Sequence, residues 1–96
     1  MSSREEVIKK LSAYKASVAN RYPIASLALF GSFARDEQND NSDIDVLVEF
    51  NGSVGSKFFE MADELEKQLG SKVDLVSRKG IKPKYFSAIK PDLIYV

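Results

Sequence analysis

The chain has 96 residues, a length that predicts a single domain over residues 1–96 with one hydrophobic core. Its 14 basic and 14 acidic residues cancel, so the sequence shows no overall signature of polyanion binding. It contains no cysteine and no histidine, which excludes disulfides, zinc–thiolate sites and imidazole-based catalysis. Catalysis by this chain would therefore depend on carboxylates, Lys, Arg, Ser, Tyr or a bound metal ion.

The charges are unevenly distributed along the chain. Residues 31–50 carry six acids against one base, Arg35, and residues 71–90 carry six bases against one acid, Asp74. If the two segments meet in the fold, they form a carboxylate cluster beside a cationic rim, which suits a metal-bound polyphosphate. A solvated basic C-terminal region explains the same pattern equally well.

The N-terminus begins with charged residues and lacks a long apolar segment, so it does not resemble a signal peptide. No apolar run approaches the length of a membrane span. We therefore expect a cytoplasmic protein without membrane association.

The first half of the chain predicts a helix, a strand and a short helix or turn. Ser3 and Glu6 fit a capping box, and apolar residues then recur at helical spacing, which predicts a helix over residues 3–21. Residues 24–30 are short, apolar and bounded by Pro and Gly, as in a buried strand. Residues 31–37 predict the short helix or turn that follows.

The second half alternates strands with helices. Residues 43–50 predict a strand, residues 56–69 a helix, residues 72–77 a strand, residues 82–89 a short helix and residues 91–96 a possible final strand. The order predicts an α/β (α+β) fold, with helices packed on a small mixed sheet.

Paired carboxylates mark the strand at residues 43–50. Asp43 and Asp45 are two residues apart, so both side chains point to the same side of a strand. Asp74 lies inside another short apolar strand, where a carboxylate is unfavourable without a partner. Asp92 is a weaker candidate for a third acid, because it follows Pro91 in an expected loop.

Two carboxylates on one face repel each other unless a cation lies between them. The alternative reading of the Asp43/Asp45 pair alone is an exposed strand face that happens to be acidic. If the strand of Asp74 is a neighbour, three carboxylates converge into an oxygen-rich cluster that suits two Mg²⁺ ions, or Mn²⁺. Such a pair of ions clamps the attacking and departing oxygens of a phosphoryl displacement.

Gly31 and Ser32 stand between a predicted buried strand and a short helix. Backbone N–H groups at a helix start attract phosphate, and glycine lets a phosphate approach the backbone closely. The plainer interpretation of Ser32 is an N-cap residue of that helix, and the two roles can hold together.

Together these residues resemble a known family. Gly31 and Ser32, ten intervening residues and then Asp43-Ile44-Asp45 resemble the signature of the DNA polymerase beta-like nucleotidyltransferase superfamily. In a chain this short, the pattern is similar to the minimal nucleotidyltransferases, over essentially the whole length. The resemblance implies a fold like the polymerase beta palm and transfer of a nucleoside monophosphate from ATP or another NTP to a hydroxyl.

The resemblance also implies roles for particular residues. Asp43, Asp45 and Asp74 would hold the metal ions, and Asp74 would receive the acceptor proton. Gly31 and Ser32 would bind the nucleotide phosphates. Arg35 would pair with phosphates or with a carboxylate of the site. The family usually has Gly after that Arg, whereas this chain has Asp36, which affects the turn that follows.

Minimal nucleotidyltransferases are often paired with a HEPN-domain protein as antitoxin and toxin, and family members have been assigned as enzymes that transfer AMP to a Tyr of that toxin. The resemblance therefore implies a HEPN-type protein as acceptor and partner, with a homo- or hetero-oligomer possible and no direct nucleic-acid binding. Two alternatives remain at this stage. One is a non-catalytic module of the same fold that neutralises or scaffolds the partner by contact, and the other is a small metal-binding or structural domain.

Overall fold

The computed structural model describes residues 3–96, beginning with helix α1 (Arg4–Ser17). The Ser3 hydroxyl accepts a hydrogen bond from the backbone N–H of Glu6 at 3.1 Å, which confirms the predicted cap. The predicted end at Arg21 is wrong. The backbone leaves the helix at Val18, and the N–H of Arg21 donates to the Val18 carbonyl at 2.9 Å in a turn that leads to Pro23.

The strands form one mixed sheet, as predicted, and the possible final strand at residues 91–96 is present only over Ile94–Tyr95, because residues 90–92 form a 3-10 turn. The strands are β1 (Ile24–Phe30), β2 (Ile44–Phe50), β3 (Val73–Ser77) and β4 (Ile94–Tyr95). Their order across the sheet is β3-β2-β1-β4. Strand β1 is antiparallel to β2 and to β4, whereas β2 and β3 are parallel.

The remaining helices agree with the predicted order. They are α2 (Gly31–Ala34), α3 (Lys57–Leu69), α4 (Pro83–Ile89) and the 3-10 turn η1 (Lys90–Asp92). Gly70 ends α3 in the left-handed conformation, with φ of 65°, as the sequence indicated. No helix in the described part of the chain is long and apolar enough to cross a membrane.

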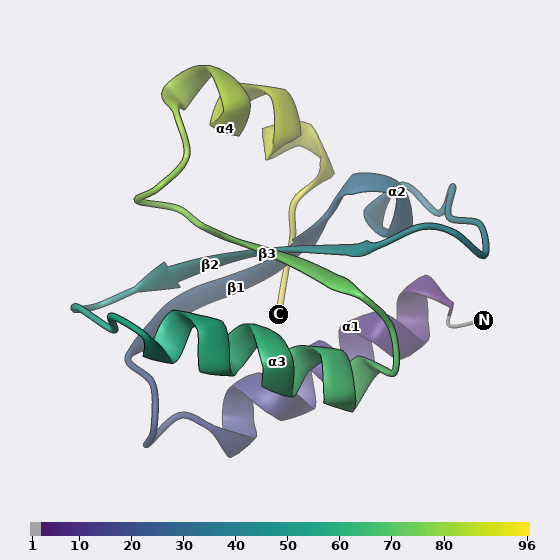
Figure 1. The fold of residues 1–96 in the computed structure, drawn as a ribbon. Coiled ribbons are helices and arrows are strands. Elements are labelled where there is room, and N and C mark those ends of the chain that lie inside the picture. Colours follow the sequence, from purple (N-terminus) through teal and green to yellow (C-terminus); the bar gives the residue numbers. More distant parts are fainter. Residues whose placement is uncertain (1–2) are drawn as a thin grey trace.

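Helices lie on both faces of the sheet (Figure 1). Helices α1 and α3 pack against one face, and α4 lies over the other. Alternation along the strands directs one set of apolar side chains to α1 and α3. We call this the core face of the sheet, and its side chains are buried. Its strand residues are Leu27, Leu29, Ile44, Val46, Val48, Val73 and Leu75.

The intervening strand residues point to the opposite face, beneath α4. Ala28, Phe30 and Leu47 are buried there, and Asp45 and Asp74 point to the same side. We call this the α4 face. No residue of α4 is itself buried, so this helix covers its face loosely. The sheet therefore presents carboxylates on a face that solvent and ligands can reach.

Candidate active site

Asp45 and Asp74 are direct neighbours across the parallel strands β2 and β3. Ile44 pairs with Val73 and Val46 with Leu75, and all four of these flanking residues are in the core. The two carboxylates between them must therefore point to the α4 face. Asp43 lies one residue before β2 and is exposed, so the predicted strand start at Asp43 is wrong by one residue. The pairing of β2 with β3 brings the acidic and basic segments together, as the charge pattern suggested.

Negative charge is crowded around Asp45. Burial raises the pKa of Asp45 to about 6, and the carboxylates of Asp74 and then Asp43 add to the increase. The Arg35 guanidinium acts in the opposite direction. Repulsion of this kind identifies the three aspartates as one electrostatic cluster, although they come from two segments far apart in sequence.

The donor set of this cluster suits a hard divalent cation. Carboxylate oxygens are the ligands that Mg²⁺ and Mn²⁺ prefer, and a bound cation would remove the repulsion that raises the pKa of Asp45. Within residues 3–96, no three His, Cys, Asp or Glu side chains are close enough together, as they stand, to hold a metal ion between them. The residues fit the ion by their chemistry and strand register.

Gly31, one of the two residues predicted to bind phosphate, lies directly against this cluster. Its backbone has φ of 76°, a left-handed conformation that favours glycine. A β-carbon at this position would collide with the Asp45 carboxylate, so only glycine allows the backbone and the carboxylate to lie so close. Asp45 also pairs with Phe30 in the β1–β2 register, which places Gly31 at the edge of the cluster.

Ser32 lies inside α2 and does not cap it. The capping position is Phe30, which makes no side-chain hydrogen bond to the helix. The reading of Ser32 as an N-cap is therefore wrong. The Ser32 side chain is partly exposed, and its position beside Gly31 keeps it next to the aspartates.

Arg35 forms ion pairs outside the aspartate cluster. Its guanidinium donates to Glu37 Oε1 at 2.9 Å and to Asp92 Oδ2 at 2.7 Å. Asp92 thus holds the residues after α4 to the loop after α2. The Asp92 carboxylate is therefore engaged by Arg35 outside the cluster. This agrees with the sequence analysis, which made Asp92 a weaker candidate than Asp74 for the third acid.

The family is decided by comparison with known proteins. Residues 11–96 match the nucleotidyltransferase domain family. This chain belongs to that family. A Methanocaldococcus jannaschii protein assigned by name as a protein adenylyltransferase is 43% identical to this nucleotidyltransferase over 100% of both chains.

Solved structures agree with the fold. A minimal nucleotidyltransferase superposes on this nucleotidyltransferase with a TM-score of 0.83 and 30% identity, over 97% of this chain and 95% of the other. A Shewanella oneidensis complex, described as a tri-AMPylated HEPN toxin with an MNT antitoxin, matches with a TM-score of 0.66 at 21% identity. That match covers 92% of this chain and 68% of the other. The predicted family and fold are confirmed.

Asp36 stands where the family resemblance led us to expect glycine, and its backbone has a conformation that glycine adopts easily. Asp36 has φ of 59°, the only positive φ at a non-glycine residue in the described part of the nucleotidyltransferase. Aspartate tolerates this conformation better than most residues. The turn therefore accommodates an aspartate at this position.

No local pattern in the sequence predicts that Tyr85 of α4 lies beside the site. Its ring packs edge-on against Phe30, with 6.5 Å between the ring centroids. Burial raises the pKa of Tyr85, and the charges of Asp74 and Asp45 add to the increase. Tyr85 therefore forms part of the wall over the α4 face of this nucleotidyltransferase.

Proposed function

We propose that this nucleotidyltransferase is a metal-dependent protein adenylyltransferase that moves AMP from ATP to a hydroxyl of a HEPN-type partner protein. In this role it acts as the antitoxin of the pair. The observation that carries the proposal is the pairing of Asp45 with Asp74 across β2 and β3, directly against the backbone of Gly31. Relatives named as protein adenylyltransferases, and the complex of an MNT antitoxin with an AMPylated HEPN toxin, support the choice of donor and acceptor.

Asp43, Asp45 and Asp74 hold Mg²⁺ in this proposal. When bound, the metal neutralises the polyphosphate and stabilises the charge that develops during phosphoryl transfer. Gly31 and Ser32 contact the phosphates through backbone N–H groups and the hydroxyl of Ser32. Because Gly31 has no side chain, the phosphates approach close to the Asp45 carboxylate.

The reaction forms a bond between the acceptor hydroxyl oxygen and the α-phosphorus of ATP. It breaks the bond from that phosphorus to the oxygen that bridges to the β-phosphate, and pyrophosphate leaves. Asp74 accepts the proton of the acceptor hydroxyl, because it is more exposed than Asp45 and faces the open side of the α4 face. A carboxylate in this position is a suitable general base once its charge is balanced.

The test is transfer of label from α-labelled ATP to the purified HEPN partner in the presence of Mg²⁺. Labelling should require Mg²⁺ and should be lost in Asp43→Asn and in Asp74→Asn. Asp40→Asn is the matched control, since Asp40 is an exposed acid of the same segment outside the cluster. Labelling retained by Asp74→Asn would reject the assignment. A variant with Asp43→Asn, Asp45→Asn and Asp74→Asn together that labels nothing but still fully neutralises the partner would indicate a non-catalytic binding module.

A further inference from the structure

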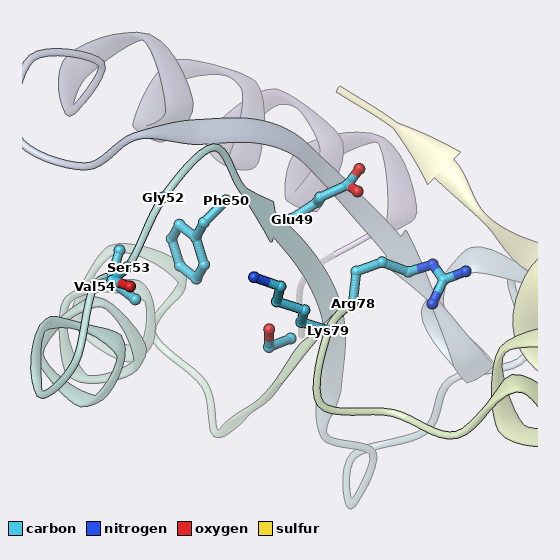
Figure 2. A pocket seen from close by; sticks show the side chains of 8 residues that line it. Glu49, Phe50, Gly52, Ser53, Val54, Arg78 and Lys79 are labelled. Atoms are coloured by element: carbon cyan, nitrogen blue, oxygen red, sulfur yellow. The ribbon is translucent and has the colours of Figure 1, made fainter.

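A second hollow lies at the other end of strands β2 and β3. It is a cavity of about 410 Å³, bounded by the ends of both strands and by the loop that leads to α3 (Figure 2). We call it the β2–β3 end cavity. Its lining residues are Glu49, Phe50, Gly52, Ser53, Val54, Ser77, Arg78 and Lys79.

This cavity is separate from the aspartate cluster. Asp45 and Asp74 lie near the amino ends of the two strands, whereas Glu49 and Arg78 each follow four residues later. Four residues span roughly 13 Å along a strand. In open sheets with parallel strands, ligands bind in the crevice outside the carboxyl ends of the strands. Within this fold, the parallel pair β2 and β3 with its connecting helix α3 builds such a crevice, on the side away from the aspartates.

Two cations line the cavity without ion-pair partners. Within residues 3–96, neither Lys79 nor Arg78 forms a salt bridge. Figure 2 shows the Lys79 ammonium directed toward the ring of Phe50, with Ser53 across the opening. The Arg78 guanidinium is held by stacking over the ring of Phe86 at 3.7 Å. Figure 2 shows that this guanidinium is directed away from Phe50, so the positive wall of the cavity is the Lys79 ammonium, and an unpaired ammonium there favours an anionic ligand.

The other wall residues favour a ligand with a planar ring. Phe50 is only partly buried, so part of its ring is available for stacking. The hydroxyls of Ser53 and Ser77 are free of hydrogen bonds within residues 3–96, so both can donate to a phosphate oxygen. The Glu49 carboxylate is directed away from Phe50 and Lys79 (Figure 2) and accepts a hydrogen bond from the Ser26 hydroxyl, so it leaves the Lys79 side of the cavity uncompensated. The volume lies in the range of small-molecule sites.

We propose that the β2–β3 end cavity is a second nucleotide site that binds a nucleoside monophosphate without a metal ion. The phosphate lies against Lys79 and the hydroxyls of Ser53 and Ser77. The base stacks on the exposed part of the Phe50 ring. This site is independent of the adenylyl-transfer chemistry proposed for the aspartate cluster.

The test follows AMP binding by amide NMR in a metal-chelating buffer, using the Asp43→Asn variant to disable the aspartate cluster. The largest shifts should fall on residues 49–54 and 77–79. In this background, Lys79→Glu should weaken AMP binding by roughly tenfold. Lys10→Ala removes an exposed positive charge from α1, far from the cavity, and should change the affinity less than about twofold.

Further probes separate the parts of the ligand. Ribose 5-phosphate and inorganic phosphate test the cationic wall, and adenosine tests the Phe50 wall. AMP should bind more tightly than each of them. Shifts confined to residues 31–45, an absence of shifts, or equal losses in Lys79→Glu and Lys10→Ala would overturn the proposal. Because the metal is removed and Asp43 is replaced, none of these outcomes depends on the adenylyl-transfer activity.

Discussion

The two faces of the sheet have the same strands and opposite properties. On the core face, Leu29 and Val46 are fully buried against α1 and α3. On the α4 face, Asp45 and Asp74 alternate with those residues along the same chain and lie under a helix with no buried residue. The comparison shows that alternation along the strands places the residues that stabilise the core on one face and the candidate catalytic aspartates on the other. A substitution among the apolar residues of the core face should change the free energy of unfolding, whereas a substitution of the aspartates on the α4 face should change activity.

The largest effect should come from Asp45→Asn on the α4 face. Loss of a metal-binding carboxylate at the centre of the cluster should lower adenylyl transfer by more than about a hundredfold. The variant should nevertheless be at least as stable as the native protein without metal, because burial and neighbouring aspartates raise the pKa of Asp45. Labelling assays and thermal unfolding measure the two quantities. A folded Asp45→Asn protein with native activity would contradict the division between the faces.

On the core face, Leu65→Ala should destabilise the protein without changing its chemistry. Leu65 of α3 is fully buried in the core, and its truncation should cost about 2–5 kcal/mol. Phe59→Ala is the matched control on the same helix. Phe59 is 70% exposed, so its loss should change stability by less than about 0.5 kcal/mol. Urea unfolding measures both, and equal costs would show that the core face is misassigned.

A smaller, pH-dependent effect should come from Glu64 of α3. Its carboxylate accepts hydrogen bonds from Arg21 at 2.5 Å, Tyr14 at 2.8 Å and Tyr22 at 3.2 Å. The bond from Arg21 is the main cause that lowers the pKa of Glu64. The contribution of Glu64 is therefore present above its unfolded pKa and is lost as the pH falls through the lower folded pKa.

Glu64→Gln should lower stability at neutral pH by about 1 kcal/mol, a value reduced for solvent screening. The difference from the native protein should shrink as the solution is acidified below the ordinary pKa of a glutamate. Urea midpoints at neutral and acidic pH test this. A deficit of the same size at both values would show that the ionised carboxylate contributes nothing.

The smallest effect should come from Asp36→Gly. Because Asp36 has φ of 59°, glycine should relieve backbone strain and stabilise the protein by about 0.5 kcal/mol, with adenylyl transfer unchanged. Asp40→Gly, in the neighbouring turn where φ is not positive, should give no gain. A thermal unfolding series compares them, and a loss of stability in Asp36→Gly would show that the aspartate side chain stabilises this turn.

Short sequence patterns predicted most of the helices and strands, and they also predicted the aspartates of the site. The cap at Ser3, the stop at Gly70 and the alternation after Asp43 each depend on a few neighbouring residues. The convergence of Asp74 with Asp45 was predicted only on the condition that their strands were neighbours, and the parallel register meets that condition.

The remaining features depend on contacts between distant segments. Tyr85 reaches the α4 face only because the chain after β3 returns over the sheet, and Arg35 meets Asp92 across 57 residues of sequence. The β2–β3 end cavity forms where two strand ends and a loop meet. No single stretch of sequence therefore predicts that Lys79 lines a cavity. Single-sequence patterns carry no information on such placements.

The most direct test of the proposed aspartate cluster is to determine where a divalent ion binds. Mn²⁺ added in small amounts should broaden the amide NMR signals of residues 31–32, 43–45 and 74 most strongly, because its paramagnetism acts on nearby nuclei. The broadening should vanish in Asp45→Asn, whereas the signals of residues 49–54 should remain sharp. Broadening centred elsewhere, or unchanged in Asp45→Asn, would contradict the claim that these three aspartates form one metal-binding cluster.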